Sequence, residues 1–203
     1  MIHTYQTIVT PSQSEFKDKG SRFIGYAYPV QTPSEIKKHL DALKEAHHKA
    51  RHICYAYRLG VDGTQFRAND DGEPSGSAGR PILGQIDSAE VTDVLVAVVR
   101  YFGGTLLGVP GLIHAYKEAA AGALSNAQII EKNIEKTVSI RCGYPVLNEA
   151  IRLAKLHHGN IIEQDLQLDC RLTVKLALAD FDACIAAWQK TRQIEIDAEC
   201  ESA

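Results

Sequence analysis

The apolar and polar residues of the N-terminal part alternate first with the period of strands and then with that of a helix. Short apolar and aromatic runs at 3–9 and 16–30, interrupted by Pro11 and Gly20, predict a hairpin of strands. The segment Thr32-Pro33-Ser34-Glu35 is typical of a capped helix start, in which Glu35 can reach back to the amide of the cap. The apolar residues that follow recur at helical spacing: Ile36, Leu40, Leu43 and Ala46. This helix should lie with its apolar face on a sheet.

The clearest strand in the pattern lies at 91–102. Its core, Val94–Val99, contains no polar residue, which predicts a strand that is covered on both faces. Another strand is predicted at 52–59 and ends at Gly60. After a glycine-rich turn a helix is predicted through Leu124. The residues along its inner side are Leu112, Tyr116, Ala119 and Ala123.

The remainder of the chain, from residue 137, carries a second complete pattern. Its order is strand, helix, two strands, helix, strand, which is that of the split βαβ or ferredoxin-like motif. Pro145 opens the first of these helices and Asp180 is the expected cap of the second. The polar segment Glu131–Lys136 is the expected linker. We therefore predict two domains, at 1–135 and 136–203. The predicted strands lie at 137–142, 161–168, 170–178 and 194–200.

The charge of the chain argues against one class of protein. The formal net charge is −3 at pH 7. Residues 1–135 carry 14 Lys and Arg against 15 Asp and Glu, and residues 136–203 carry 8 against 10, so neither part is basic. Nucleic-acid affinity depends mainly on cations that meet phosphates, so this balance argues against a generic nucleic-acid coat protein, and no DNA specificity is expected. A local basic patch is compatible with this balance.

The five cysteines are odd in number and include no Cys-x-x-Cys pair. We therefore expect free thiols, without a disulfide framework or a thiolate zinc site. The polar N-terminus has no apolar signal-peptide core, and the longest aliphatic run, Val94–Val99, is too short to cross a bilayer. These features predict a cytoplasmic protein without a membrane partner. No metal and no other cofactor is expected.

The segment Asp70–Pro81 reads Asp-Asp-Gly-Glu-Pro-Ser-Gly-Ser-Ala-Gly-Arg-Pro, with three glycines and two prolines that fix its backbone path. One interpretation is a shaped connection in which Ser75 or Ser77 caps the next helix. The alternative is that its three carboxylates hold Mg²⁺ or pair with a cationic partner. Those carboxylates belong to Asp70, Asp71 and Glu73.

A second glycine-rich segment, Arg100–Gly111, joins the buried strand to a helix start, where free amides and the helix dipole favour anions. No carboxylate occurs from residue 94 to residue 117, whereas Arg100, His114 and Lys117 are present. This charge pattern makes the segment a candidate phosphate site. It is neither a Walker A loop nor a Gly-x-Gly-x-x-Gly motif. The alternative is that the glycines allow tight packing and that Arg100 pairs with Asp70 or Asp71.

These segments resemble the IMPACT family, including its bacterial YigZ-type members. The resemblance rests on Ser21–Gly25, Arg51–Leu59, the whole of Asp70–Pro81, and Val98–Gly104 with Leu107-Gly108. It covers the whole chain, because bacterial members also have a small C-terminal domain of this length.

The resemblance implies an α/β (α+β) fold in two domains. The first would be a left-handed βαβ domain, similar to a small-subunit ribosomal protein, to domain four of elongation factor G and to GHMP-type kinases. The second would be a ferredoxin-like βαββαβ domain, similar to the terminal domain of elongation factor G. Eukaryotic relatives regulate translation by competing for an activator of a starvation-responsive initiation-factor kinase. The family has no established catalytic residues, so none is assigned here.

We expect a non-enzymatic binding protein linked to translation, whose partner is the ribosome, RNA or a translation factor. The alternatives are a Mg-dependent enzyme that uses phosphate or a nucleotide, and an adaptor that binds only protein. The expected surface presents backbone amides and arginines to a negative partner. It becomes a shared site if the segments around Asp70 and Gly103 line one exposed surface. The candidate binding residues are Arg22, Asp70, Asp71, Glu73, Ser75, Arg80, Arg100, Gly103, Gly104, Gly108, Gly111 and Lys117.

Overall fold

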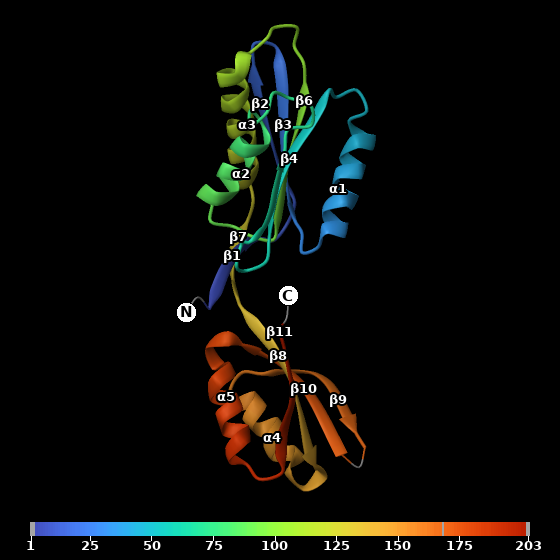
Figure 1. The fold of residues 1–203 in the computed structure, drawn as a ribbon, viewed down its shortest axis with the longest axis vertical. Coiled ribbons are helices and arrows are strands. Elements are labelled where there is room, and N and C mark those ends of the chain that lie inside the picture. The colour runs from blue at the N-terminus through green and yellow to red at the C-terminus, as the bar shows by residue number, and fades with distance from the viewer. Residues whose placement is uncertain (1–2, 168, 202–203) are drawn as a thin grey trace. The chain divides into compact units, whose positions relative to one another are not determined.

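The computed structural model describes residues 3–167 and 169–201, with side chains as far as residue 197. The chain folds into two compact units (Figure 1). The first unit is Tyr5–Lys132, and the second comprises residues 133–201 with His3 and Thr4. Both units combine helices with antiparallel sheets, which confirms the predicted mixed α/β, two-domain class.

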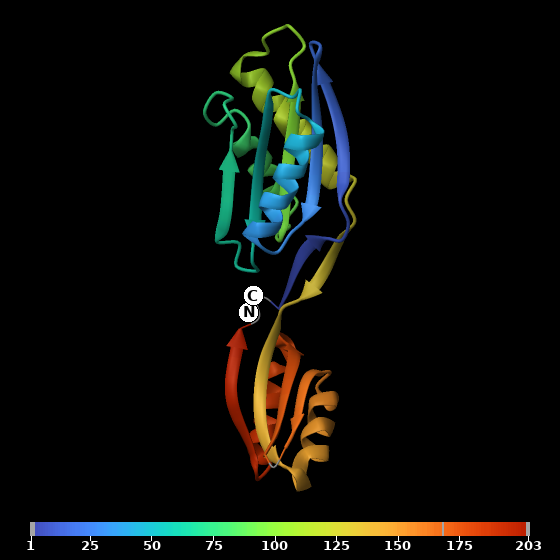
Figure 2. The same cartoon turned by 90° about the vertical axis from the view of Figure 1, so that its right-hand side faces the viewer.

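The first unit is built on a five-stranded sheet with the order β2-β3-β6-β4-β5, in which all neighbours are antiparallel. The central strand is buried from Val94 to Arg100, as its unbroken apolar run predicted. One helix lies on one face of the sheet and two lie on the other (Figure 2). The strands are β2 Ser12–Asp18, β3 Ser21–Pro29, β4 His52–Leu59, β5 Gln65–Asn69 and β6 Val94–Tyr101. The helices are α1 Pro33–Ala46 on the first face and α2 Gly79–Ser88 and α3 Gly108–Ser125 on the second.

Helix α1 follows its sequence pattern. The hydroxyl of Thr32 accepts the Glu35 amide at 3.2 Å, so the predicted cap is confirmed. The Glu35 carboxylate reaches back to the amide of Gln31, at 2.7 Å, one residue earlier than expected. The buried residues of the helix are Ile36, Leu40 and Leu43.

Helix α3 approaches the sheet closely because small residues line the contact. Gly25 of β3 has no Cβ, and one built there would lie 2.2 Å from the carbonyl oxygen of Ala119. The hydroxyls of Ser12 and Ser14 donate to the carbonyls of Ala123 and Ala119, at 2.7 and 2.6 Å. The β2–β3 hairpin is therefore fixed to α3 by both packing and hydrogen bonds.

Two expectations about the N-terminal strands and the linker are wrong. The hairpin consists of β2 and β3 alone, because β1, Thr4–Ile8, pairs with β7, Ile129–Asn133, in a separate two-stranded sheet. The expected linker Glu131–Lys136 lies largely in β7 and in β8, Glu135–Gly143. The residues of β7 are mostly exposed, so a polar sequence is compatible with a strand there.

The second unit has the strand order β11-β8-β10-β9 and is ferredoxin-like, as predicted. Its core is completed by Trp188, whose indole N–H donates to the carbonyl of Ala150 at 3.1 Å. Asp180 is not the cap of its helix, which begins at Leu178, and lies instead in the first turn. Further elements are α4 Tyr144–Leu156, β9 Asn160–Leu166, β10 Asp169–Ala177, α5 Leu178–Lys190 and β11 Ile194–Glu201.

Four cysteines have described side chains, and all four are free and buried. They are Cys54, Cys142, Cys170 and Cys184. The side chain of Cys200 lies outside the described residues. Within the described part of the chain, every helix is too short or too polar to span a membrane.

The close approach of α3 can be tested at Gly25. Replacement Gly25→Ala places a methyl group against the Ala119 carbonyl, so we expect a loss of at least about 2 kcal/mol in the free energy of unfolding. Gly84→Ala is the matched control, because a Cβ there meets no atom within 4 Å and Gly84 lies inside α2. This control should gain about 0.5–1 kcal/mol. Urea unfolding followed by circular dichroism measures both, and equal stabilities would contradict the packing described.

Candidate functional site

Asp70 organises the segment that follows it. Its carboxylate accepts the backbone N–H groups of Gly76, Ala78 and Gly79, at 2.9, 3.0 and 2.8 Å. Ala78 and Gly79 begin α2, so this carboxylate satisfies the free amides at the start of that helix. Burial alone would raise the pKa of Asp70, but these amide donors, together with the charge on Arg80, hold it below its usual range.

The expectation that Ser75 or Ser77 caps α2 is wrong. Ser75 is exposed, and the hydroxyl of Ser77 donates to the carbonyl of Pro74 at 2.6 Å. Ala78 occupies the cap position and has no side chain to serve as cap. A carboxylate eight residues upstream takes this role, which local capping patterns do not reveal.

Asp71 connects the same segment to β4. Its carboxylate accepts the N–H of Ile53 at 2.7 Å, and its carbonyl lies 2.7 Å from Nδ1 of His52. Asp71 holds a positive φ of 42°, which directs the chain into the turn. The three carboxylates of this segment thus have separate internal partners. Among the described residues, no group of three or more His, Cys, Asp or Glu is arranged to hold a metal ion.

Glu73 is buried and forms an ion pair with Arg100 of β6, with 2.5 Å between Oε1 and a guanidinium nitrogen. The hydroxyl of Tyr116 on α3 donates to the same oxygen at 2.8 Å. His52 Nε2 lies 3.9 Å away. One carboxylate oxygen therefore holds together the Asp70–Pro81 segment, the central strand and a helix.

The thiol and the phenol hydroxyl of this network are neutral. The thiol of Cys54 lies 3.3 Å from the Tyr116 hydroxyl and 3.0 Å from the Asp70 carbonyl. Burial raises the pKa of Cys54, and it likewise raises that of Tyr116. Neither group is ionised at neutral pH, so Cys54 is not a reactive thiolate.

The expectation that Arg100 points outward is wrong, and so is its pairing with Asp70 or Asp71. Its side chain is only 7% exposed. The guanidinium lies 5.4 Å from the ring centroid of Phe23 and 5.6 Å from that of Phe102. Arg100 is therefore enclosed by aromatic rings and its carboxylate partner, and it does not present its charge to a large partner.

At its start, the glycine turn after β6 packs closely against the backbone of the β2–β3 hairpin. A Cβ on Gly103 would lie 1.9 Å from the backbone of Gly20. The N–H of Gly103 donates to the hydroxyl of Ser21 at 3.2 Å. Gly104 and Gly108 have positive φ values, 88° and 68°, which favour glycine. Gly111 lies in the first turn of α3. The two motifs thus meet through the buried pair Glu73–Arg100, and not as one exposed charged surface.

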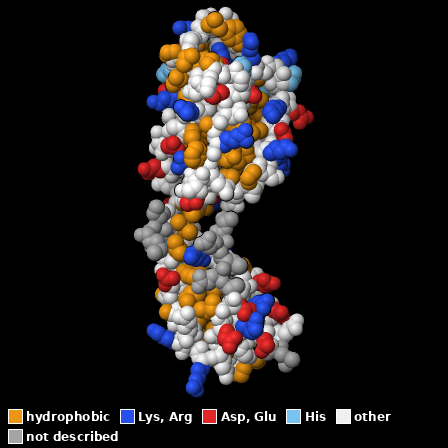
Figure 3. Space-filling model, viewed as in Figure 1, with side chains coloured by type: hydrophobic (Ala, Val, Ile, Leu, Met, Phe, Trp, Pro, Cys, Tyr) orange, Lys and Arg blue, Asp and Glu red, His pale blue; other side chains and the backbone are white. Residues whose placement is uncertain are grey.

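Large apolar side chains are exposed on this turn and on the start of α3, which sequence reasoning missed. Leu106 is 84% exposed. In Figure 3 hydrophobic side chains gather at the end of the first unit that carries this turn, with Lys and Arg beside them. The signal in the sequence was an apolar residue placed among glycines, where no core can form. We call this set the turn surface: Phe102, Leu106, Val109 and Ile113.

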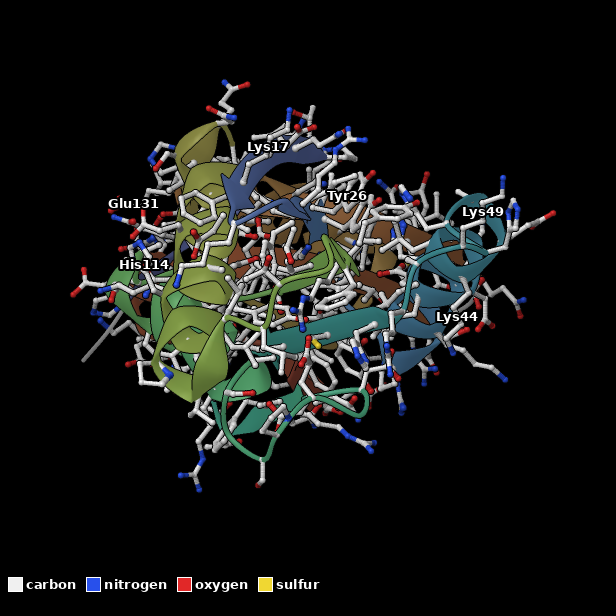
Figure 4. All side chains as sticks on the ribbon, turned by 90° about the horizontal axis from the view of Figure 1, so that it is seen from above. Lys17, Tyr26, Lys44, Lys49, His114 and Glu131 are labelled. Carbon is white, nitrogen blue, oxygen red and sulfur yellow. The ribbon has the colours of Figure 1, made fainter. Side chains whose placement is uncertain are left out.

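The remaining candidate cations are exposed. Arg22 forms a surface ion pair with Glu15 at 2.5 Å, whereas Arg80 and Lys117 lie on the surface of α2 and α3. Figure 4 views this end of the first unit and shows Lys17 and His114 on the side of β2 and α3. The structure therefore separates the candidate residues into buried scaffold and exposed surface.

The chain belongs to the IMPACT family, because residues 19–124 match the Impact N-terminal domain and its relatives over most of its length are bacterial members of this family. IMPACT family member YvyE of Bacillus subtilis is 34% identical over 149 residues, which are 73% of this chain and 69% of the relative. IMPACT family member YigZ of Escherichia coli is 33% identical over 177 residues, 85% of this chain and 87% of the relative. A solved structure described as a crystal structure of a hypothetical protein aligns over 100% of both chains, with a TM-score of 0.75 and 30% identity.

The buried ion pair can be tested by a double-mutant cycle. Arg100→Met removes the cationic partner of the buried Glu73 carboxylate, so we expect a loss of about 3–5 kcal/mol in the free energy of unfolding. The double variant Glu73→Leu/Arg100→Met should lose less than the sum of the single losses by at least about 1 kcal/mol. The matched control is the exposed pair Glu149–Arg152, at 2.7 Å. Its cycle should give less than about 1 kcal/mol. Additive losses at Glu73 and Arg100 would contradict the coupling.

The Asp70 hydrogen bonds predict a specific pH dependence. The pKa of Asp70 is lower in the folded than in the unfolded state, where it is about 3.9. Its contribution is therefore complete above that value and is lost as the pH falls through the folded pKa. Asp70→Asn should remove this part of the acid dependence and lower stability at neutral pH. Urea unfolding between neutral and acidic pH measures the difference, and parallel curves for the two proteins would contradict the prediction.

Proposed function

We propose that this protein is a non-enzymatic binding protein linked to translation, with the ribosome, RNA or a translation factor as its partner. The family to which the chain belongs supports the link to translation, because the resemblance implies that role. The binding role rests on a single observation, which is that the site is divided into internally paired residues and exposed residues. Its carboxylates, its thiol and Arg100 have internal partners, whereas the apolar side chains of the turn surface and the cations Arg80 and Lys117 remain on the surface.

The exposed half of the site suits a negatively charged partner that also offers apolar groups. The turn surface lies in a stretch, 94–117, that contains no carboxylate. Helix α3 starts at Gly108 without a side-chain cap, so its first amides and its dipole add positive potential beside the turn surface. Arg22, Arg80 and Lys117 are the exposed cations that we propose as contacts.

The alternative, a Mg-dependent enzyme that uses phosphate or a nucleotide, has less support. A Mg²⁺ site needs carboxylate oxygens that converge on one point and remain accessible. Here the three candidate carboxylates turn to the α2 amides, to the Ile53 amide and to Arg100.

The proposal also includes a cytoplasmic location, where ribosomes, RNA and translation factors are found.

Co-sedimentation with purified ribosomes at low and moderate salt tests the proposal. We expect the protein to pellet with ribosomes and to be released as salt rises, because phosphate contacts weaken with salt. Leu106→Asp and Lys117→Glu should each reduce pelleting, because they remove apolar area and a cation. Lys155→Glu on α4 is the matched charge reversal outside the proposed surface and should leave pelleting unchanged.

Three outcomes separate the alternatives. Absence of pelleting at micromolar protein, together with no RNA binding, overturns the proposal. A partner that is retained after nuclease treatment identifies the protein-only adaptor. Stabilisation of the protein by nucleotide with Mg²⁺ identifies the enzyme, since ligand at 100 times its Kd adds about 2.7 kcal/mol.

A further inference from the structure

Helix α1 covers only part of its face of the sheet in the first unit. His39 stacks on Tyr28 of β3, with 4.2 Å between ring centroids. His47 lies 2.8 Å from the hydroxyls of both Tyr26 on β3 and Tyr101 on β6. These contacts place α1 over β3 and β6, and the apolar cluster beneath it extends to Ile53 and Leu59 of β4. Figure 2 shows α1 in front of the middle of the sheet, with the edge strand β5 uncovered to its left.

Two tyrosines of β4 lie on this face between the buried residues Ile53 and Leu59, at the side toward β5. Tyr55 and Tyr57 pack against the same apolar cluster as α1 and are only partly buried. They are separated by one residue, so their rings are spaced by roughly 7 Å along the strand. Neither hydroxyl has a hydrogen-bond partner among the described residues. The sheet therefore presents two neighbouring aromatic rings with free polar tips.

Cations lie on both sides of these rings. Arg67 of β5 is the register partner of Tyr57, and it is exposed. Lys37 and Lys44 are exposed on the flank of α1 opposite His39, which is the flank nearer β4 and β5. Figure 4 shows Lys44 at this flank, and Figure 3 shows hydrophobic side chains between β5 and α1 with basic side chains around them.

These cations are available for a ligand. Within the described ranges, Lys37 and Arg67 form no ion pair, and Nζ of Lys44 lies 3.9 Å from the Asp41 carboxylate, beyond hydrogen-bond distance. Asp41 is the acidic residue on the same flank. The face therefore carries three cations against one carboxylate, although the whole chain has a net charge of −3.

We propose that this open face, formed by Tyr55, Tyr57, Arg67, Lys37 and Lys44, binds single-stranded RNA. This rests on the proposed function, because it selects RNA among the partners proposed there and assigns it a surface apart from the turn surface. The rings stack on unpaired bases, and the flanking cations contact the phosphates. The free tyrosine hydroxyls can bond to phosphate or to the 2′-hydroxyl.

The arrangement favours a single strand over other anionic ligands. A duplex hides the faces of its bases, so the rings would find nothing to stack on. An acidic peptide would satisfy the cations but would leave two adjacent aromatic rings without a planar partner. Unpaired bases joined by phosphates match both features, because every base has a π-face and every nucleotide has a charge.

Fluorescence anisotropy with a labelled oligouridylate of about ten nucleotides tests the inference on the full chain. We expect salt-dependent binding by the wild type. Tyr55→Ala/Tyr57→Ala should weaken it at least about fivefold, because each ring supplies stacking. Tyr55→Phe/Tyr57→Phe should retain most of the affinity, since the rings remain. Tyr144→Ala in the second unit is the matched control, because Tyr144 is 71% exposed and lies outside this face.

Charge variants keep the test valid if the alanine variant folds poorly. Lys37→Gln and Arg67→Gln are surface changes, and each should reduce the slope of log affinity against log salt by about 0.7. Equal affinities and slopes in all variants overturn the inference. Ribosome pelleting without oligonucleotide binding overturns it and leaves the proposed function standing. Oligonucleotide binding that depends on Tyr55 and Tyr57 without ribosome pelleting supports it and counts against the ribosome.

Discussion

The first unit depends on one buried carboxylate oxygen. Glu73 Oε1 receives both the Arg100 guanidinium and the Tyr116 hydroxyl, so the Asp70–Pro81 segment, the central strand and α3 meet at a single atom. A buried charge is tolerated only when its partner is equally fixed, and the Phe23 and Phe102 rings hold Arg100 in place. Both motifs that stand out in the sequence are thereby committed to holding the fold together.

Because both motifs hold the fold together, the interior of the unit differs in kind from its surface. The candidate carboxylates and Cys54 lie inside or have internal partners, whereas apolar side chains, lysines and arginines are exposed and the rings of Tyr55 and Tyr57 are partly buried. Binding energy at such surfaces comes from desolvated apolar area and from charge complementarity. This division between interior and surface is what the proposed binding role requires.

Periodicity predicted the parts whose stability is local or whose pattern is unambiguous. The run Val94–Val99 indicated a strand covered on both faces, and the Thr32–Glu35 cap indicated the start of α1. The sequence did not reveal pairings between distant segments. Asp70 accepts the first amides of α2 because the loop between them folds back on itself. Arg100 pairs with Glu73 and not with Asp70 or Asp71, and only the three-dimensional structure shows this choice of partner. The family resemblance predicted the mixed α/β, two-domain class correctly, but it gave no geometry for the site.

The contact between Gly20 and Gly103 has a consequence for association rates and affinity. Two backbones that touch without side chains leave the turn little freedom to rearrange, so the free protein keeps one shape there. A surface fixed in this way loses little conformational entropy when a partner docks, and rigid-body association becomes the expected pathway. The rigid turn therefore holds Leu106 on the surface and prevents it from folding back onto the core of the first unit.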